Sequence, residues 1–86
     1  MTKADEKPPA LEDSRGLKCP LPALKTRRAL ARLEGGATLI VLADDPMAAI
    51  DIPHLVRELG DELVEASQQA AALRFVIRKR AGGGRS

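Results

Sequence analysis

Cys19, the only cysteine in this 86-residue chain, is the side chain best suited to covalent chemistry. It lies in the stretch Gly16-Leu17-Lys18-Cys19-Pro20-Leu21-Pro22, where two prolines indicate a helix start, because proline is tolerated where amide hydrogens have no helical partner. A helix start concentrates partial positive charge and Lys18 adds a cation, so both favour the thiolate over the thiol. The sequence therefore predicts an exposed, reactive cysteine at or beside a helix N-cap. The residues expected to shape this site are Gly16, Lys18, Pro20 and Pro22.

The sequence leaves other roles open for this cysteine. A lone cysteine is often a buried, inert small hydrophobe, although the neighbouring lysine and proline argue against burial here. One cysteine cannot form an intramolecular disulfide, and with one histidine it cannot supply the four ligands of a structural zinc site. His54 could serve as a base for Cys19, but its place in the first turn of another predicted helix is more typical of an exposed surface residue. We therefore expect no bound metal and no cofactor.

Charge is distributed unevenly along the chain although the net charge is only +2. Residues 14–33 hold six basic residues and no acid, whereas residues 34–65 hold eight acids against Arg57 alone. A basic block around the thiol would steer acidic partners toward it and help to hold a thiolate, but such a block is equally typical of a solvated helix face. The basic residues expected to dock a partner are Arg15, Lys25, Arg27, Arg28 and Arg32.

Hydrophobic periodicity predicts alternating strands and helices. Apolar residues at intervals of three and four indicate two helices, and alternating or continuous runs rich in β-formers indicate the strands. Right-handed crossovers between parallel strands would place both helices on one side of the sheet. The sequence thus predicts an α+β fold: a two-layer α/β sandwich, βαβαββ, with a four-stranded mixed sheet and two helices on one face. The predicted strands are 10–14, 38–43, 62–67 and 73–79, and the predicted helices are 20–33 and 51–59.

Turn and cap residues set the expected ends of these elements. Gly35-Gly36 is expected to end the first helix, and Gly60 the second. Asp51 is a good N-cap for the second helix, with Pro53 in its first turn. Asp44 and Asp45 precede a proline and are best explained as turn and cap residues. The continuous apolar run 38–43 predicts a central strand covered on both faces or nearly so.

The chain has room for one small domain, which we expect over residues 10–80. Residues 1–9 are expected to be a disordered extension because they are mainly charged residues and prolines, and the glycine-rich residues 81–86 a flexible tail. The opening residues do not resemble a secretory signal, and no apolar stretch is long enough to span a bilayer. We therefore expect a cytoplasmic protein that does not contact membranes.

Four stretches together resemble the TusA/SirA-like family of sulfur-carrier proteins. They are Asp13-Ser-Arg-Gly-Leu-Lys-Cys-Pro-Leu-Pro22, Ala43-Asp-Asp-Pro46, Asp51-Ile-Pro53 and Arg74-Phe-Val-Ile-Arg-Lys79. The similarity runs from about residue 11 to residue 80 with the element order intact. Some members have a further cysteine shortly after the Asp-Ile-Pro element, where this chain has Leu55 and Val56, so a role for a second thiol is absent.

The resemblance implies a sulfurtransferase that carries persulfide sulfur on Cys19. It implies a cysteine desulfurase as the donor and a downstream sulfur-relay protein as the acceptor, for example in tRNA thiolation. Attack on the donor persulfide needs the thiolate form of Cys19. Pro20 and Pro22 have no amide hydrogen, so the amides of Leu21 and Ala23 would be the nearby hydrogen-bond donors to the sulfur.

The alternative function is a small regulatory or RNA-binding adaptor with an incidental cysteine, since Arg74, Arg78 and Arg80 could lie on the open sheet face. Phe75, the only aromatic residue, is predicted to lie on the other face and could not stack a base, so we expect no direct nucleic-acid binding. A mainly wet sheet face favours a monomer that meets its partners transiently.

Overall fold

Four strands and two helices follow one another in the order βαβαββ, in a computed structural model that describes residues 8–81. Most of the predicted disordered extension, 1–9, and of the predicted tail, 81–86, lies outside the described residues. The elements are β1 (Ala10–Asp13), α1 (Leu21–Ala31), β2 (Thr38–Ala43), α2 (Ala48–Leu59), β3 (Glu62–Gln69) and β4 (Ala72–Arg78).

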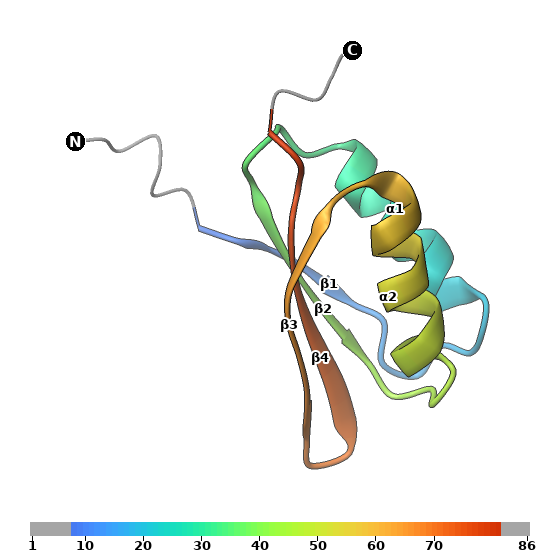
Figure 1. Cartoon of the computed structure of the whole chain (residues 1–86). Helices are drawn as coiled ribbons and strands as arrows, with labels where there is room; N and C mark the ends of the chain where they lie inside the picture. The colour runs from blue at the N-terminus through green and yellow to red at the C-terminus, as the bar shows by residue number, and fades with distance from the viewer. Residues whose placement is uncertain (1–7, 82–86) are drawn as a thin grey trace.

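The strands form one mixed sheet in the order β1-β2-β4-β3. β1 pairs with β2 in parallel, whereas β4 runs antiparallel to both β2 and β3. Both helices cover one face of this sheet and leave the other face open, as right-handed crossovers require (Figure 1). The β3–β4 hairpin extends past the helices at its turn (Figure 1), where Ala70 adopts the left-handed backbone (φ 52°) that tight hairpin turns need. The predicted two-layer α+β sandwich is confirmed.

The core lies between the helices and the covered face of the sheet. In β2, Leu39, Val41 and Ala43 are buried, whereas the residues between them are only partly buried on the open face. The prediction of a central strand is confirmed, although the helices cover one of its faces only and the other face is partly buried. β4 alternates as predicted and contributes Phe75 and Ile77. The helices complete this small core with Leu30, Ala48, Ile52, Leu55 and Val56.

α1 is shorter than its periodicity predicts. It begins at Leu21, so Pro20 is the N-cap rather than a first-turn residue. It ends at Ala31 rather than at Gly35-Gly36, because the chain tightens there: the Leu33 amide donates to the carbonyl of Leu30, three residues back, at 3.1 Å. The pair of glycines instead forms the connection to β2.

α2 begins three residues earlier than predicted. Its cap is Met47, so Asp51 lies inside the first turn and Pro53 lies within the helix. The early start has a local cause: the carbonyl of Asp45 accepts the Ala48 amide at 2.9 Å and its side chain accepts the Met47 amide at 3.1 Å. The predicted end is confirmed at Gly60, which has the left-handed backbone (φ 79°) typical of helix C-termini.

The parallel pairing of β1 and β2 determines where the site forms. Parallel strands end at the same edge of a sheet, so the chain leaves both strands at one edge and both helices begin there. The β1–α1 loop carries Cys19, and the β2–α2 loop carries the acidic residues of the stretch Ala43-Asp-Asp-Pro46. The fold thus brings a thiol and several carboxylates to one end of the molecule.

Candidate functional site: an exposed thiol among carboxylates

Cys19 is exposed, as predicted, and lies one residue before the N-cap of α1. The Cys19–Pro20 peptide bond is cis. Pro22, the second residue of α1, is buried, whereas Lys18 and Pro20 are exposed beside the thiol. The side chain of Cys19 is therefore exposed to solvent on a loop that is anchored at its helical end by the buried Pro22.

Two carboxylates from the β2–α2 loop hold the loop that carries the thiol. Asp44 accepts the Gly16 amide at 3.0 and 3.1 Å, and Asp45 accepts the Cys19 amide at 2.5 Å. Gly16 has a positive φ (87°), a backbone conformation that a residue with a side chain would adopt only with strain. The hydrogen bonds from the Cys19 and Met47 amides lower the pKa of Asp45. Beyond their predicted turn and cap roles, these two aspartates therefore fix the backbone of the thiol loop.

Asp51 lies against the thiol itself. The Cys19 S–H donates to Asp51 Oδ2 across 3.2 Å, joining two residues that are 32 positions apart in the chain. This hydrogen bond, followed by partial desolvation and by the negative charges of Asp51 and Asp45, raises the pKa of Cys19. The prediction that the helix start and Lys18 would lower this pKa is wrong, because nearby carboxylates disfavour a second negative charge. The prediction that Asp51 is an N-cap is also wrong: α2 begins at Ala48 with Met47 as its cap, so the Asp51 side chain is available to contact the thiol.

Of the two backbone amides predicted to donate to the Cys19 sulfur, that of Leu21 already has another hydrogen-bond partner. The Leu21 amide donates to the carbonyl of Lys18 at 2.8 Å, which closes the turn that carries Cys19. The prediction that this amide points to the sulfur is therefore wrong: the turn itself uses it.

Two of the basic residues predicted to dock a partner, Arg15 and Lys25, pair with acidic side chains of β1. The guanidinium group of Arg15 donates two hydrogen bonds to the carboxylate of Asp13, each 2.8 Å long. These bonds lower the pKa of Asp13 to about 2. Lys25 lies 3.6 Å from Glu12. The carboxylates that contact Cys19 come from the loop after β2 and from the first turn of α2, whereas Lys25, Arg27 and Arg28 lie further along α1.

The remaining predicted docking residues lie along α1 and just beyond it. Arg27 lies 3.9 Å from Glu58, whereas Arg28 is exposed and has no ion pair with any residue of 8–81. Arg32 follows the last helical residue, at the far end of α1 from the thiol. Arg28 is therefore the basic residue of α1 best placed to meet a partner's carboxylate.

Four exposed apolar side chains lie at the end of the two helices where the thiol loop lies, and the sequence analysis does not single them out. They belong to the first turns of the two helices and to the cap of α2. Their exposed fractions are 44–64%, which is high for large apolar residues. We call this set the apolar collar; it consists of Leu21, Leu24, Met47 and Ile50.

The open sheet face carries arginine side chains, and among residues 8–81 it presents no aromatic ring. Phe75 is buried under the helices, as predicted, so it offers no ring to stack on a base. Arg74 lies 3.5 Å from Glu65, and Arg78 is exposed. His54 is exposed on α2 with its ring 3.6 Å from Glu58, as expected for a surface residue.

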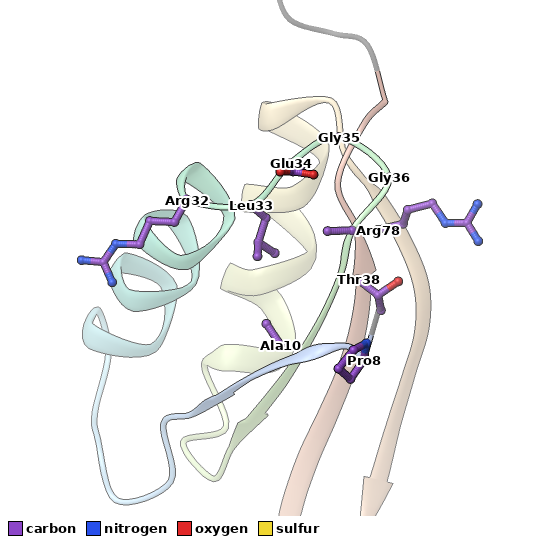
Figure 2. A pocket seen from close by; sticks show the side chains of 10 residues that line it. Pro8, Ala10, Arg32, Leu33, Glu34, Gly35, Gly36, Thr38 and Arg78 are labelled. Carbon is purple, nitrogen blue, oxygen red and sulfur yellow. The ribbon is translucent and has the colours of Figure 1, made fainter. Parts of the chain in front are cut away.

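A hollow of about 500 Å³ lies at the opposite end of the sheet from Cys19. It is lined by the starts of β1 and β2 and by the connection after α1 (Figure 2). Figure 2 shows the side chains of Arg32 and Arg78 pointing away from this hollow on opposite sides. The guanidinium groups of Arg32 and Arg78 therefore do not converge on this hollow.

Residues 8–81 contain neither a metal-binding cluster nor a membrane-spanning helix. No group of three or more histidine, cysteine or acidic side chains there is arranged to hold a metal ion. No helix there has the length and apolar character needed to cross a bilayer.

Known proteins match this chain in sequence and in fold. A family described as "Sulfurtransferase TusA" matches residues 13–79. A protein of Archaeoglobus fulgidus named "Putative sulfur carrier protein" is 46% identical over 67 residues, which cover 77% of this chain and 87% of the relative. The crystal structure of a SirA-like protein from Desulfitobacterium hafniense superposes with a TM-score of 0.74 at 23% identity and covers 83% of this chain and 97% of that one. The last comparison supports the fold.

The family match spans both the thiol loop and the aspartates that hold it. It begins at Asp13, before the thiol loop, and ends at Lys79, after the last strand. The sequence resemblance is therefore confirmed, and the chain belongs to the TusA family of sulfurtransferases.

Proposed function

We propose that this protein is a sulfur carrier that accepts persulfide sulfur from a cysteine desulfurase on Cys19. It passes the sulfur to a downstream relay protein, for example one that serves tRNA thiolation. The observation that carries the proposal is an exposed thiol on a loop that two aspartates hold in place. We also propose residues 10–80 as the working carrier domain and the cytoplasm as its location.

The proposed transfer is a thiol exchange that needs no added oxidant or reductant. Cys19 Sγ attacks the outer sulfur of the donor persulfide, donor–S–SH, and the bond between the two donor sulfurs breaks. The bonding electron pair stays on the donor's inner sulfur, and one proton passes from Cys19 to that sulfur. The products are Cys19–S–SH and donor–SH.

The apolar collar supports a transient protein partner at this site. Donor and acceptor sulfurs belong to other proteins, so the thiol must enter a partner's active site, and the collar supplies apolar area that such contact would bury. Leu21 and Leu24 approach from α1, and Met47 and Ile50 from the start of α2. The starts of both helices thus supply exposed apolar surface that a partner protein could contact.

The direct test is to incubate the protein with a cysteine desulfurase and cysteine and then to measure its intact mass. We expect a gain of one sulfur atom, which a reductant removes. Protein whose Cys19 has first been blocked with iodoacetamide should gain nothing. A wild-type protein that gains no sulfur under these conditions would contradict the proposed function.

Reversing the charge of Arg27 and Arg28 to glutamate should slow sulfur uptake by roughly tenfold at low salt. Arg28 has no ion pair among the described residues and is free to meet an acidic partner surface. The rate of uptake, measured against ionic strength, should also lose much of its salt dependence. The matched control reverses Arg74 and Arg78 on the open sheet face, and an equal slowing in both variants would show that only net charge matters.

A further inference from the structure

Cys19 and Asp51 form a contact whose two sides are both fixed by backbone hydrogen bonds. The Cys19 amide is held by Asp45, and the Asp51 amide donates to the carbonyl of Met47 at 2.8 Å inside the first turn of α2. The Asp51 side chain is only partly buried and the thiol is exposed, so a partner can reach the pair. The backbone positions that bring Sγ and Oδ2 to 3.2 Å of each other are therefore fixed by the fold.

A thiol in this position cannot transfer sulfur without losing its proton. The attacking species is the thiolate, but the hydrogen bond to Asp51 and the nearby carboxylates raise the pKa of Cys19 and so disfavour that species. The leaving donor thiolate, in turn, needs a proton. The transfer therefore calls for a group that accepts a proton beside Sγ and returns it to the donor.

We propose that Asp51 is the catalytic base and acid of sulfur transfer, an inference that rests on the proposed function. Its carboxylate accepts the Cys19 proton as Sγ attacks the outer sulfur of the donor persulfide. Its carboxylic acid then gives that proton to the donor's inner sulfur, which leaves with the electron pair of the broken S–S bond. The carboxylate is restored, the proton is conserved, and Cys19 carries the added sulfur.

The other titratable groups near the pair are already engaged. Asp45 uses one oxygen for the Cys19 amide and the other for the Met47 amide, and the charge of Lys18 acts on this same carboxylate. From α2, His54 is the next titratable side chain after Asp51, and it lies against Glu58 instead. Asp51 is thus the carboxylate in direct contact with the sulfur.

The replacement Asp51→Asn separates a proton-transfer role from a purely electrostatic one. Without the carboxylate, the pKa of Cys19 should fall, so more thiolate is present at a given pH. Sulfur uptake should nevertheless slow by about 10²-fold at about pH 6, because the base is lost, and should then rise with pH as free thiolate forms. If Asp51 acted only by its charge, the variant would transfer sulfur faster than wild type.

Both quantities can be measured on this chain. It has no tryptophan or tyrosine, so the ultraviolet absorbance of the thiolate reports the Cys19 titration directly. Uptake is followed by intact mass with desulfurase and cysteine over a range of pH. The matched control is Glu62→Gln, which removes an exposed carboxylate at the other end of the sheet and should behave as wild type.

The conservative variant Asp51→Glu provides a second test, because it keeps a base and should keep the wild-type shape of the pH profile at a lower rate. A thermal melt establishes that each variant is folded. The proposal is overturned if Asp51→Asn takes up sulfur as fast as wild type at every pH, or if Asp51→Glu shows the profile of the asparagine variant. Failure of wild type to take up sulfur would instead overturn the proposed function, so the two failures are distinguishable.

Discussion

Serine at position 19 is expected to abolish sulfur uptake while leaving the fold intact. A hydroxyl cannot form the S–S bond that carries the cargo, and this chain has no other cysteine to replace it. The side chain is exposed and outside the core, so the free energy of unfolding should change by no more than about 0.5 kcal/mol. Intact mass after incubation with desulfurase and cysteine measures the uptake, and a thermal melt measures the stability.

Cys19→Ala is the control for the effect of the serine hydroxyl, since a hydroxyl could still hydrogen-bond Asp51. Both variants should lack the added sulfur and melt near the wild-type temperature. Sulfur retained by either variant would show that the cargo is held elsewhere on the chain. A regulatory adaptor with an incidental cysteine would instead keep its activity in both variants.

Alanine at position 75 is expected to destabilise the domain by about 3–5 kcal/mol. Phe75 is 2% exposed and packs in the centre of the covered sheet face, where its loss leaves a cavity that a thin core cannot fill. A domain of this size has a small total stability, of the order of 5 kcal/mol at the low end, so much of the protein should be unfolded at moderate temperature. Urea denaturation followed by circular dichroism measures the loss.

Val76→Ala is the matched control, because it shortens the next residue of β4 on the open face. Val76 is only partly buried, so its replacement should be much less destabilising than that of Phe75. Equal losses would mean that the open face is also packed, for example against a second copy of the chain.

The arrangement of the elements could be predicted from local pattern. The alternation of Phe75 and Ile77 with more polar neighbours reports which face of β4 is covered, because side chains alternate across a strand. Gly60 ends α2 as predicted, because a left-handed residue suits glycine. The start of α2 is predicted wrongly because Asp51 is a good cap by residue type, whereas the structure places the cap at Met47, whose amide donates to the Asp45 side chain.

The sequence by itself determined that a single thiol lies beside a proline-marked helix start, and that the elements follow in the order βαβαββ. Only the tertiary structure decided the charge around that thiol. The aspartates that hold and contact Cys19 come from 26 and 32 residues further along, and Lys18, its neighbour in the chain, does not set its pKa. Electrostatic interactions depend on distance in space, which the parallel pairing of β1 and β2 sets and which no local spacing encodes.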